Sequence, residues 1–358
     1  MHANNNQKRE SYIIWPAHKF ISIITKLRNM SPHMMLGFLF IFLCILWIVL
    51  RFFKRFASQS HTFHRTKHTY SRQARKLYKP PTEYFLNKDN LYIYYSEKQG
   101  LNVPNEEVKF FVLIVHGIGE HSGRYQQLSE TLVNELGVVV VSLDHQGHGK
   151  SEGDSLFVVE FEDYICDVME VVRQTKKKFK NSQCILLGHS MGGLIAIRCI
   201  EKYAQEFSFA IISAPALSVH ASSIERRLAP ILSSVLPKFP MKTIDINNLS
   251  HDPCVVDLYA NDPLVSTGGV TARLGAEILS EIDKALAFSY DFVVPYLLMR
   301  GSKDQIVSGD GIRQFHANSN SSDKTFYEFP ELFHEIFQEP KSPAIPEVVK
   351  WLKLHLNF

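Results

Sequence analysis

A serine between glycines is the first feature of this sequence with chemical potential. The five residues Gly188-His-Ser-Met-Gly192 follow a short apolar run that ends at Leu187 and precede a run typical of a helix. Small residues two positions before and after a serine, between a strand and a helix, form the pattern of a nucleophile elbow, which exposes the hydroxyl oxygen above a sheet. Ser190 is therefore a candidate nucleophile.

An activated serine needs a base and a group that orients the base. The hydrolase order places an acid and then a histidine downstream of the serine. Asp304 follows one apolar run and His334 follows the next, so both fall at strand ends, where active-site residues of open α/β sheets gather. We predict Asp304 as the acid and His334 as the base. The remaining candidates are the bases His251, His316 and His355 and the acids Asp291 and Asp323.

The same chemistry needs N–H donors for an oxyanion. One donor is expected from the residue after the nucleophile, Met191, and the other from the loop after an early strand. That loop begins His116-Gly-Ile118, and Gly117 permits a close turn that would direct the Ile118 N–H inward. His116 itself is assigned a structural role.

Three motifs that would indicate a cofactor or metal fail on spacing. Gly117-Ile-Gly119 lacks the third glycine of a dinucleotide-binding loop, because the next glycine is one position too late. Asp144 stands where a phosphate loop ending in Gly149-Lys-Ser needs its first glycine. His334 and Glu335 begin a zinc-protease motif, but Gln338 replaces its second histidine. We therefore predict no cofactor and no metal.

Short apolar runs alternate with amphipathic stretches along the second part of the chain. Such continuous apolar strands, separated by helices, indicate an α/β fold with a mostly parallel central sheet and helices on both faces. Strands are predicted at 91–95, 110–116, 138–143, 184–188, 209–213, 296–300 and 325–329, and helices at 125–136, 161–179, 191–203, 309–316 and 345–356.

One long stretch interrupts this alternation. Between about 214 and 291 no strand pattern occurs, and the runs 224–236 and 274–288 favour short helices. An insertion of this length after a strand is better explained as a functional lid than as a structureless loop. We predict a helical lid there.

The N-terminal part differs in charge and hydropathy from the rest. Residues 1–79 carry 14 lysines and arginines against one acid, and residues 34–50 hold no charge. Extended to 53, the apolar run is long enough for a membrane-anchor helix with a snorkelling arginine. The predicted organisation is a basic segment at 1–33, a transmembrane anchor at 34–53, a basic linker at 54–88 and a domain of the α/β fold at 89–358, which includes the lid.

The anchor determines how the basic leader is interpreted. Its positive charge fits anionic lipid, so no nucleic-acid partner is predicted. Cations near the apolar run are more numerous after it than before it, which by the positive-inside rule puts the catalytic domain in the cytosol of a single-pass membrane protein. The cations before the run are Lys19, Lys26 and Arg28, and those after it are Arg51, Lys54, Arg55, Arg65 and Lys67.

Longer motifs extend the pattern beyond the serine. They are His116-Gly-Ile-Gly-Glu-His-Ser-Gly-Arg-Tyr125, Asp144-His-Gln-Gly-His-Gly-Lys-Ser-Glu-Gly153, Gly188-His-Ser-Met-Gly-Gly193 and Asn261-Asp-Pro-Leu264. Together they resemble the monoglyceride lipase (monoacylglycerol lipase) family of the α/β-hydrolase superfamily. The likeness runs from about residue 80 to the end and includes the lid.

This resemblance implies hydrolysis of monoacylglycerols to fatty acid and glycerol, with Ser190, Asp304 and His334 as the triad. Phe337 departs from the family pattern, because members often place a second histidine there, near the glycerol end of the site. The hydrophobic leader is a second departure. Related hydrolases share much of the pattern, so a lysophospholipase or another lipid carboxylesterase is an alternative. A non-catalytic lipid-binding protein on this fold is another.

A lipid substrate also follows from physical reasoning. A long acyl chain gains roughly 0.8 kcal/mol per buried methylene, so it stays in the bilayer unless an equally apolar tunnel receives it. An anchored domain with an apolar lid meets that requirement. The predicted partners are therefore a lipid ester and the bilayer, and the sequence indicates no oligomeric state. The apolar lid residues are Ile231, Leu232, Val235, Leu236, Leu274, Ile278, Leu279, Leu286 and Phe288.

Overall fold

The computed structural model describes residues 51, 83–100, 104–219 and 221–356. The predicted basic segment, all of the predicted anchor except Arg51, and nearly all of the predicted linker lie outside these residues. No helix within the described ranges combines the length and the apolar character that a bilayer span requires.

A single eight-stranded sheet forms the centre of the domain, in the order β1-β2-β4-β3-β5-β6-β7-β8. The pairs β1–β2 and β2–β4 are antiparallel and all the others are parallel, so the predicted mostly parallel sheet is confirmed. The strands are β1 (Tyr84–Leu86), β2 (Tyr92–Lys98), β3 (Phe110–Val115), β4 (Val139–Leu143), β5 (Gln183–His189), β6 (Phe207–Ser213), β7 (Tyr296–Gly301) and β8 (Lys324–Phe329).

The first strand corrects the predicted start of the domain. β1 lies within 54–88, the range predicted as linker, yet its residues pair with β2 in register from Tyr84 opposite Tyr94 to Leu86 opposite Tyr92. A strand of three residues at a sheet edge leaves no hydrophobic period to detect. The sheet therefore begins before residue 89.

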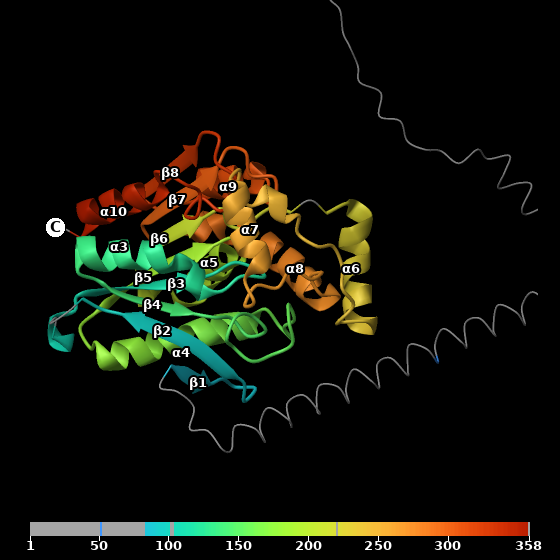
Figure 1. Ribbon diagram of the computed structural model, residues 1–358, viewed down its shortest axis with the longest axis horizontal. Coiled ribbons are helices and arrows are strands. Elements are labelled where there is room, and N and C mark those ends of the chain that lie inside the picture. The colour runs from blue at the N-terminus through green and yellow to red at the C-terminus, as the bar shows by residue number, and fades with distance from the viewer. Residues whose placement is uncertain (1–50, 52–82, 101–103, 220, 357–358) are drawn as a thin grey trace, which may run out of the picture. The chain divides into compact units, whose positions relative to one another are not determined.

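Helices cover both faces of the sheet (Figure 1). Side chains alternate along β3, so that Leu113 joins the cluster with α4, α5, α8 and α9, whereas Ile114 joins the cluster with α3 and α10. Every residue of β3 is apolar because both of its faces are covered. These helices are α3 (Gln126–Leu136), α4 (Glu162–Lys178), α5 (Met191–Tyr203), α8 (Ala272–Phe288), α9 (Gly309–Asn318) and α10 (Ala344–His355).

Between β6 and β7 the chain forms helices and loops. α6 (Ser223–Val235) begins with a capping box made by Ser222 and Glu225, and α7 (Pro253–Asn261) and α8 follow. Ser266 donates its backbone N–H to the Gly119 carbonyl at 2.7 Å, and His121 Nε2 lies 2.9 Å from Asp262 Oδ2. These bonds hold the segment against the loop after β3.

Candidate active site

Ser190 occupies a strained turn between β5 and α5. Its φ of 55° and ψ of −119° lie in a region that L-residues rarely adopt. A Cβ at position 188 would lie 2.3 Å from the Gly192 carbonyl oxygen, and one at position 192 would lie 2.0 Å from the Val115 carbonyl oxygen. Gly188 is therefore required for the turn to close, and Gly192 for the turn to pack against β3.

The N–H groups predicted as oxyanion donors belong to Ile118 and Met191. Met191 is the first residue of α5, where backbone N–H groups have no partner within the helix. Within the described part of the chain, neither N–H donates a hydrogen bond. Gly117 brings the loop close to the nucleophile, because a Cβ there would lie 3.1 Å from Ser190 Cβ. Both donors therefore belong to segments that border the serine.

Asp304 and His334 meet at the same edge of the sheet. Asp304 follows β7 and His334 follows β8, and His334 Nδ1 lies 2.7 Å from Asp304 Oδ2. The other carboxylate oxygen accepts the N–H groups of Ile306 and Val307 at 2.8 and 3.0 Å. Because Nδ1 donates to the carboxylate, Nε2 of the neutral ring is left as a proton acceptor.

The environment of this pair favours its ionised form. Burial acts to raise the pKa of the Asp304 carboxyl, but the charge of His334 and the backbone N–H groups outweigh burial and hold that pKa below its usual range. Burial acts to lower the pKa of His334, but the charge and hydrogen bond of Asp304 raise it above the ordinary histidine value. The pair is thus prepared to stabilise an imidazolium.

Ser190 and His334 line one small recess of about 10 Å³, together with Gly117, Ile118 and Glu120. The hydrogen bonds among the described residues do not include one between the Ser190 hydroxyl and His334. Catalytic hydrogen bonds are often long without substrate and shorten when it binds.

The rival bases have other partners. His316 Nδ1 bonds the Tyr296 hydroxyl at 2.9 Å, and His355 Nε2 lies 3.0 Å from Asp323, one of the rival acids. His251 Nδ1 lies 2.6 Å from Glu339 Oε2. Asp291, the other rival acid, is exposed at the end of a short 3-10 helix after α8. None of these residues lines the recess beside Ser190.

Two positions singled out in the sequence have packing roles. His116 Nδ1 lies 2.7 Å from the Gly117 carbonyl, and its Nε2 accepts the N–H of His145 at 2.9 Å. His116 therefore joins the ends of β3 and β4. Phe337 is buried and packs edge-on against Tyr125, with ring centroids 6.3 Å apart.

A mostly apolar cavity of about 330 Å³, called the tunnel below, is lined by Ser190 and by residues of the segment between β6 and β7. Ile118, Met191 and Ile306 line it near the serine, and its lining also includes Ala229 of α6 and Leu279 of α8. Its volume lies within the range of small-molecule sites.

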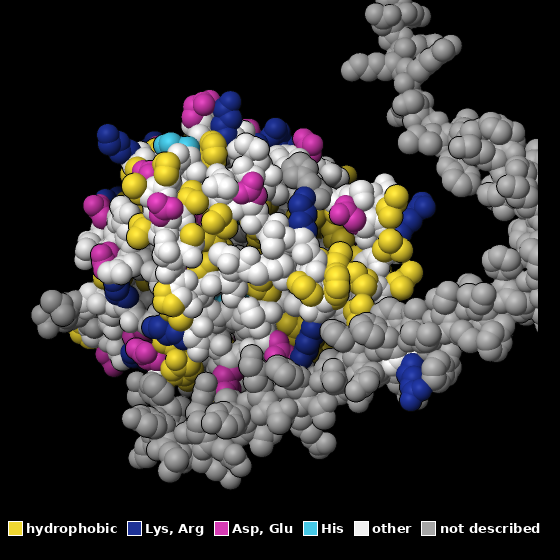
Figure 2. Space-filling view, turned by 45° about the vertical axis from the view of Figure 1, so that its right-hand side comes forward, with side chains coloured by type: hydrophobic (Ala, Val, Ile, Leu, Met, Phe, Trp, Pro, Cys, Tyr) yellow, Lys and Arg dark blue, Asp and Glu magenta, His cyan; other side chains and the backbone are white. Residues whose placement is uncertain are grey.

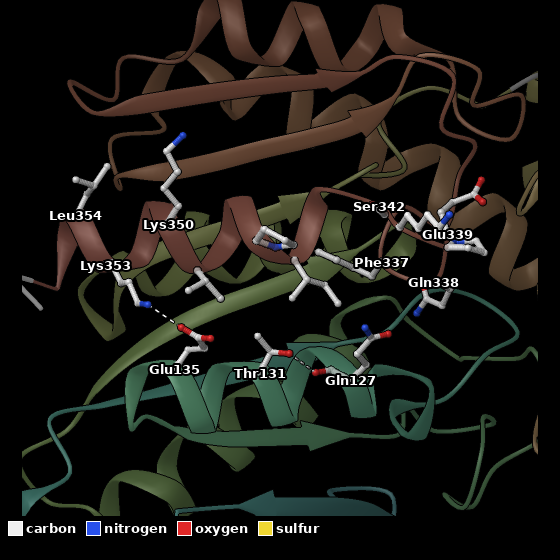
Figure 3. A pocket seen from close by; sticks show the side chains of 15 residues that line it. Gln127, Thr131, Glu135, Phe337, Gln338, Glu339, Ser342, Lys350, Lys353 and Leu354 are labelled. Carbon is white, nitrogen blue, oxygen red and sulfur yellow. Dashed lines mark hydrogen bonds and ion pairs between the residues drawn. The ribbon is translucent and has the colours of Figure 1, made fainter.

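A larger cleft of about 790 Å³ lies between α3 and α10 (Figure 3). Lys353 crosses it to Glu135 at 2.7 Å, and Phe337 lies at its edge. Ser190, Asp304 and His334 are absent from its lining. The tunnel and the recess are therefore lined by the serine, and this cleft is not.

Sequence reasoning missed several residues around the recess. Glu120, Tyr259, His189 and Glu335 line it, and Arg124 bonds both acids. Glu120 and Arg124 are part of the motif from His116 to Tyr125, and this motif was the feature of the sequence from which their place near the site could have been predicted. Tyr259 and Glu335 carry no local signal. Among the described residues, no group of three or more histidine, cysteine or acidic side chains is arranged to hold a metal ion.

A serine in a strained strand-to-helix turn, with a histidine and an acid after two later parallel strands, defines the α/β-hydrolase fold. The family model described as "Serine aminopeptidase, S33" matches residues 106–341.

Several of the relatives carry monoglyceride or monoacylglycerol lipase names. A monoglyceride lipase of Rattus norvegicus is 32% identical over 257 residues, which cover 71% of this chain and 83% of the rat protein. A monoglyceride lipase of Homo sapiens is 30% identical over 278 residues, which cover 77% of this chain and 88% of the human protein. The crystal structure of a Paleococcus ferrophilus monoacylglycerol lipase is 30% identical with a TM-score of 0.66, covering 74% of this chain and 99% of that chain. The chain therefore belongs to the monoglyceride lipase family of serine hydrolases, which confirms the resemblance.

Proposed function

We propose that this chain hydrolyses monoacylglycerols to free fatty acid and glycerol through an acyl-enzyme on Ser190. The observation that carries the proposal is the 2.7 Å bond between His334 Nδ1 and Asp304 Oδ2, beside a recess that Ser190 also lines. The names of the relatives support the monoacylglycerol substrate.

The proposed mechanism uses each of these groups once per half-reaction. His334 Nε2 accepts the Ser190 proton as Oγ attacks the ester carbonyl, and the ionised Asp304 stabilises the resulting imidazolium. The N–H groups of Ile118 and Met191 hold the oxyanion, each typically contributing ~3 kcal/mol. His334 then protonates the glycerol oxygen as the ester C–O bond breaks. Water repeats the cycle on the acyl-enzyme and releases the fatty acid.

The tunnel supports an acyl chain on one side of the serine, since its lining is mostly apolar and begins at Ser190. The recess, which Ser190 also lines, is bordered by the carboxylates of Glu120 and Glu335, which share the single guanidinium of Arg124. Two acids against one cation oppose an anionic phosphate, so a neutral glycerol head is favoured over the head of an anionic lysophospholipid such as lysophosphatidic acid.

Side-by-side assay of purified protein on monooleoylglycerol, lysophosphatidic acid and lysophosphatidylcholine tests both the charge argument and the lysophospholipase alternative. We expect faster fatty-acid release from monooleoylglycerol, and Ser190→Ala should lower kcat by several orders of magnitude. Faster hydrolysis of lysophosphatidylcholine would instead make the chain a lysophospholipase. An unaltered rate in Ser190→Ala would reject the nucleophile.

The outer face of the lid supports the bilayer as a partner. Ile224, Leu228, Ile231 and Val235 are 70%, 53%, 61% and 42% exposed, and their spacing places them on one face of α6. Ala229, on the opposite face, is buried over the tunnel. Hydrophobic side chains gather on this projecting part of the domain in Figure 2. We propose that 214–291 is a lid whose α6 faces the membrane.

We further propose that residues 34–53 anchor the chain, between the basic segment 1–33 and a linker that ends before β1, with the catalytic domain in the cytosol. The uncharged run at 34–50 and the cations that follow it support this arrangement. Carbonate washing of membranes should leave the full chain in the pellet, and protease added to sealed vesicles with the cytosolic face outward should cleave the domain. Release by carbonate would reject the anchor.

A further inference from the structure

A buried ion network lies beside the proposed triad, and the mechanism above does not use it. Arg124 donates to both oxygens of Glu335, with 2.7 Å between Nη2 and Oε2, and Nη1 also reaches Glu120 Oε2 at 3.2 Å. The Arg124 side chain is 10% exposed, and those of Glu120 and Glu335 are each 3% exposed. Buried ion pairs add little net stability compared with apolar packing, so this network requires another explanation.

The network joins the two loops whose separation matters for the reaction. Glu120 Oε1 accepts the Gly117 N–H at 2.6 Å and the Tyr125 hydroxyl at 2.7 Å, so it fixes the turn that precedes Ile118. Glu335 directly follows His334 in the chain. Arg124 is therefore the link between the loop of one oxyanion donor and the loop of the base.

We propose that Glu335 is a positioning residue, which acts through Arg124 and Glu120 to hold His334 and the Ile118 N–H at a fixed separation. The proposal rests on the proposed function. Misplacing reacting groups by about 1 Å can cost roughly a hundredfold in rate, so this link would contribute mainly to kcat. It would contribute little to the binding of p-nitrophenyl butyrate, which has no glycerol head to reach the recess that Glu120 and Glu335 line.

Electrostatics gives the network a second measurable effect. The charged and titratable groups that face His334 are Asp304 from the loop after β7, Glu120 from the loop after β3, Glu335 and His189. Burial holds the pKa of His189 well below its ordinary value, so this ring is neutral. Asp304, then Glu335, then Glu120 act to raise the pKa of His334. Neutralising Glu335 removes one anion and leaves Arg124 less compensated, so the pKa of His334 should fall.

The test compares Glu335→Gln with Glu331→Gln in the purified full chain, using p-nitrophenyl butyrate across a range of pH. Glu331 lies on the same loop, and its side chain is 81% exposed. For Glu335→Gln we expect a roughly tenfold to hundredfold lower kcat, a KM within about twofold, and an acid limb of kcat/KM at lower pH. Glu331→Gln should match the parent. A folded Glu335→Gln with parental kcat and parental acid limb would overturn the proposal.

Glu335→Asp covers the case in which the glutamine variant does not fold. Aspartate keeps the charge but shortens the reach to Arg124, so kcat should fall while the acid limb stays at the parental pH. A parental kcat in Glu335→Asp would overturn the positioning role. Ser190→Ala distinguishes failure of the positioning role from failure of the proposed function. If Ser190 is the nucleophile, the Ser190→Ala variant has no esterase activity, whatever the Glu335 variants show.

Discussion

Replacing Asp304 by asparagine should nearly abolish turnover while leaving the fold intact. The substitution keeps the shape of the side chain, and Oδ1 can still accept the N–H groups of Ile306 and Val307. The amide nitrogen then faces His334 Nδ1, where the carboxylate oxygen lies 2.7 Å away in the parent. An amide donates in that direction, so Nδ1 must become the acceptor and the proton moves to Nε2. His334 then no longer accepts the Ser190 proton.

The size of the loss follows from the same contact. Unit charges about 4 Å apart interact by about 4 kcal/mol at an effective dielectric of 20, and this attraction stabilises the imidazolium in the transition state. Each 1.4 kcal/mol corresponds to about tenfold, so Asp304→Asn should lower kcat by about three orders of magnitude. The wrong tautomer adds to that loss.

Initial rates with p-nitrophenyl butyrate measure kcat and KM, and a thermal melt shows whether the variant is folded. Asp323→Asn is the matched control, because Asp323 also pairs with a histidine, His355, away from Ser190. A folded Asp304→Asn protein whose kcat stays within about tenfold of the parent would refute the assignment of the acid.

Three other predictions test the turn, the tunnel and the base. Gly192→Ala should destabilise the domain by about 3 kcal/mol or more in urea unfolding, since its Cβ would lie 2.0 Å from the Val115 carbonyl oxygen; Gly268→Ala, with nothing within 4 Å, should not. Gly275→Phe should reduce hydrolysis of long-chain monoacylglycerols and spare short esters, because position 275 lines the tunnel with open space at its Cβ; equal losses would contradict this. Activity requires a neutral His334, and the pKa of His334 is raised above its ordinary value of 6.5. The acid limb of kcat/KM, measured against pH, should therefore have its midpoint above 6.5. A midpoint below 6.5 would contradict the assignment of His334 as the base.

Much of the sheet could be predicted because its strands are covered on both faces. β3 reads Phe-Phe-Val-Leu-Ile-Val, a continuous apolar run that only a doubly covered strand explains. The start of α5 at Met191 was fixed by the tight glycine turn before it. β1 was missed, because three edge residues depend on pairing with β2 rather than on their own pattern.

The site was predictable only where topology determines proximity. Ser190, Asp304 and His334 follow strands β5, β7 and β8, and the carboxyl ends of parallel strands meet at one edge of the sheet. Arg124 and Glu335 lie 211 positions apart, and their contact depends on how two loops pack. Tyr259 reaches the recess from α7, and the path that the chain takes between β6 and β7 has no signature in sequence.

The central claim is that Ser190 is an activated nucleophile, and reaction with a fluorophosphonate probe tests it most directly. We predict covalent labelling of the purified chain at the peptide that contains Ser190, at a rate that falls strongly in His334→Ala and disappears in Ser190→Ala. Absence of labelling in the folded parent, or a label on a different residue, would contradict the account.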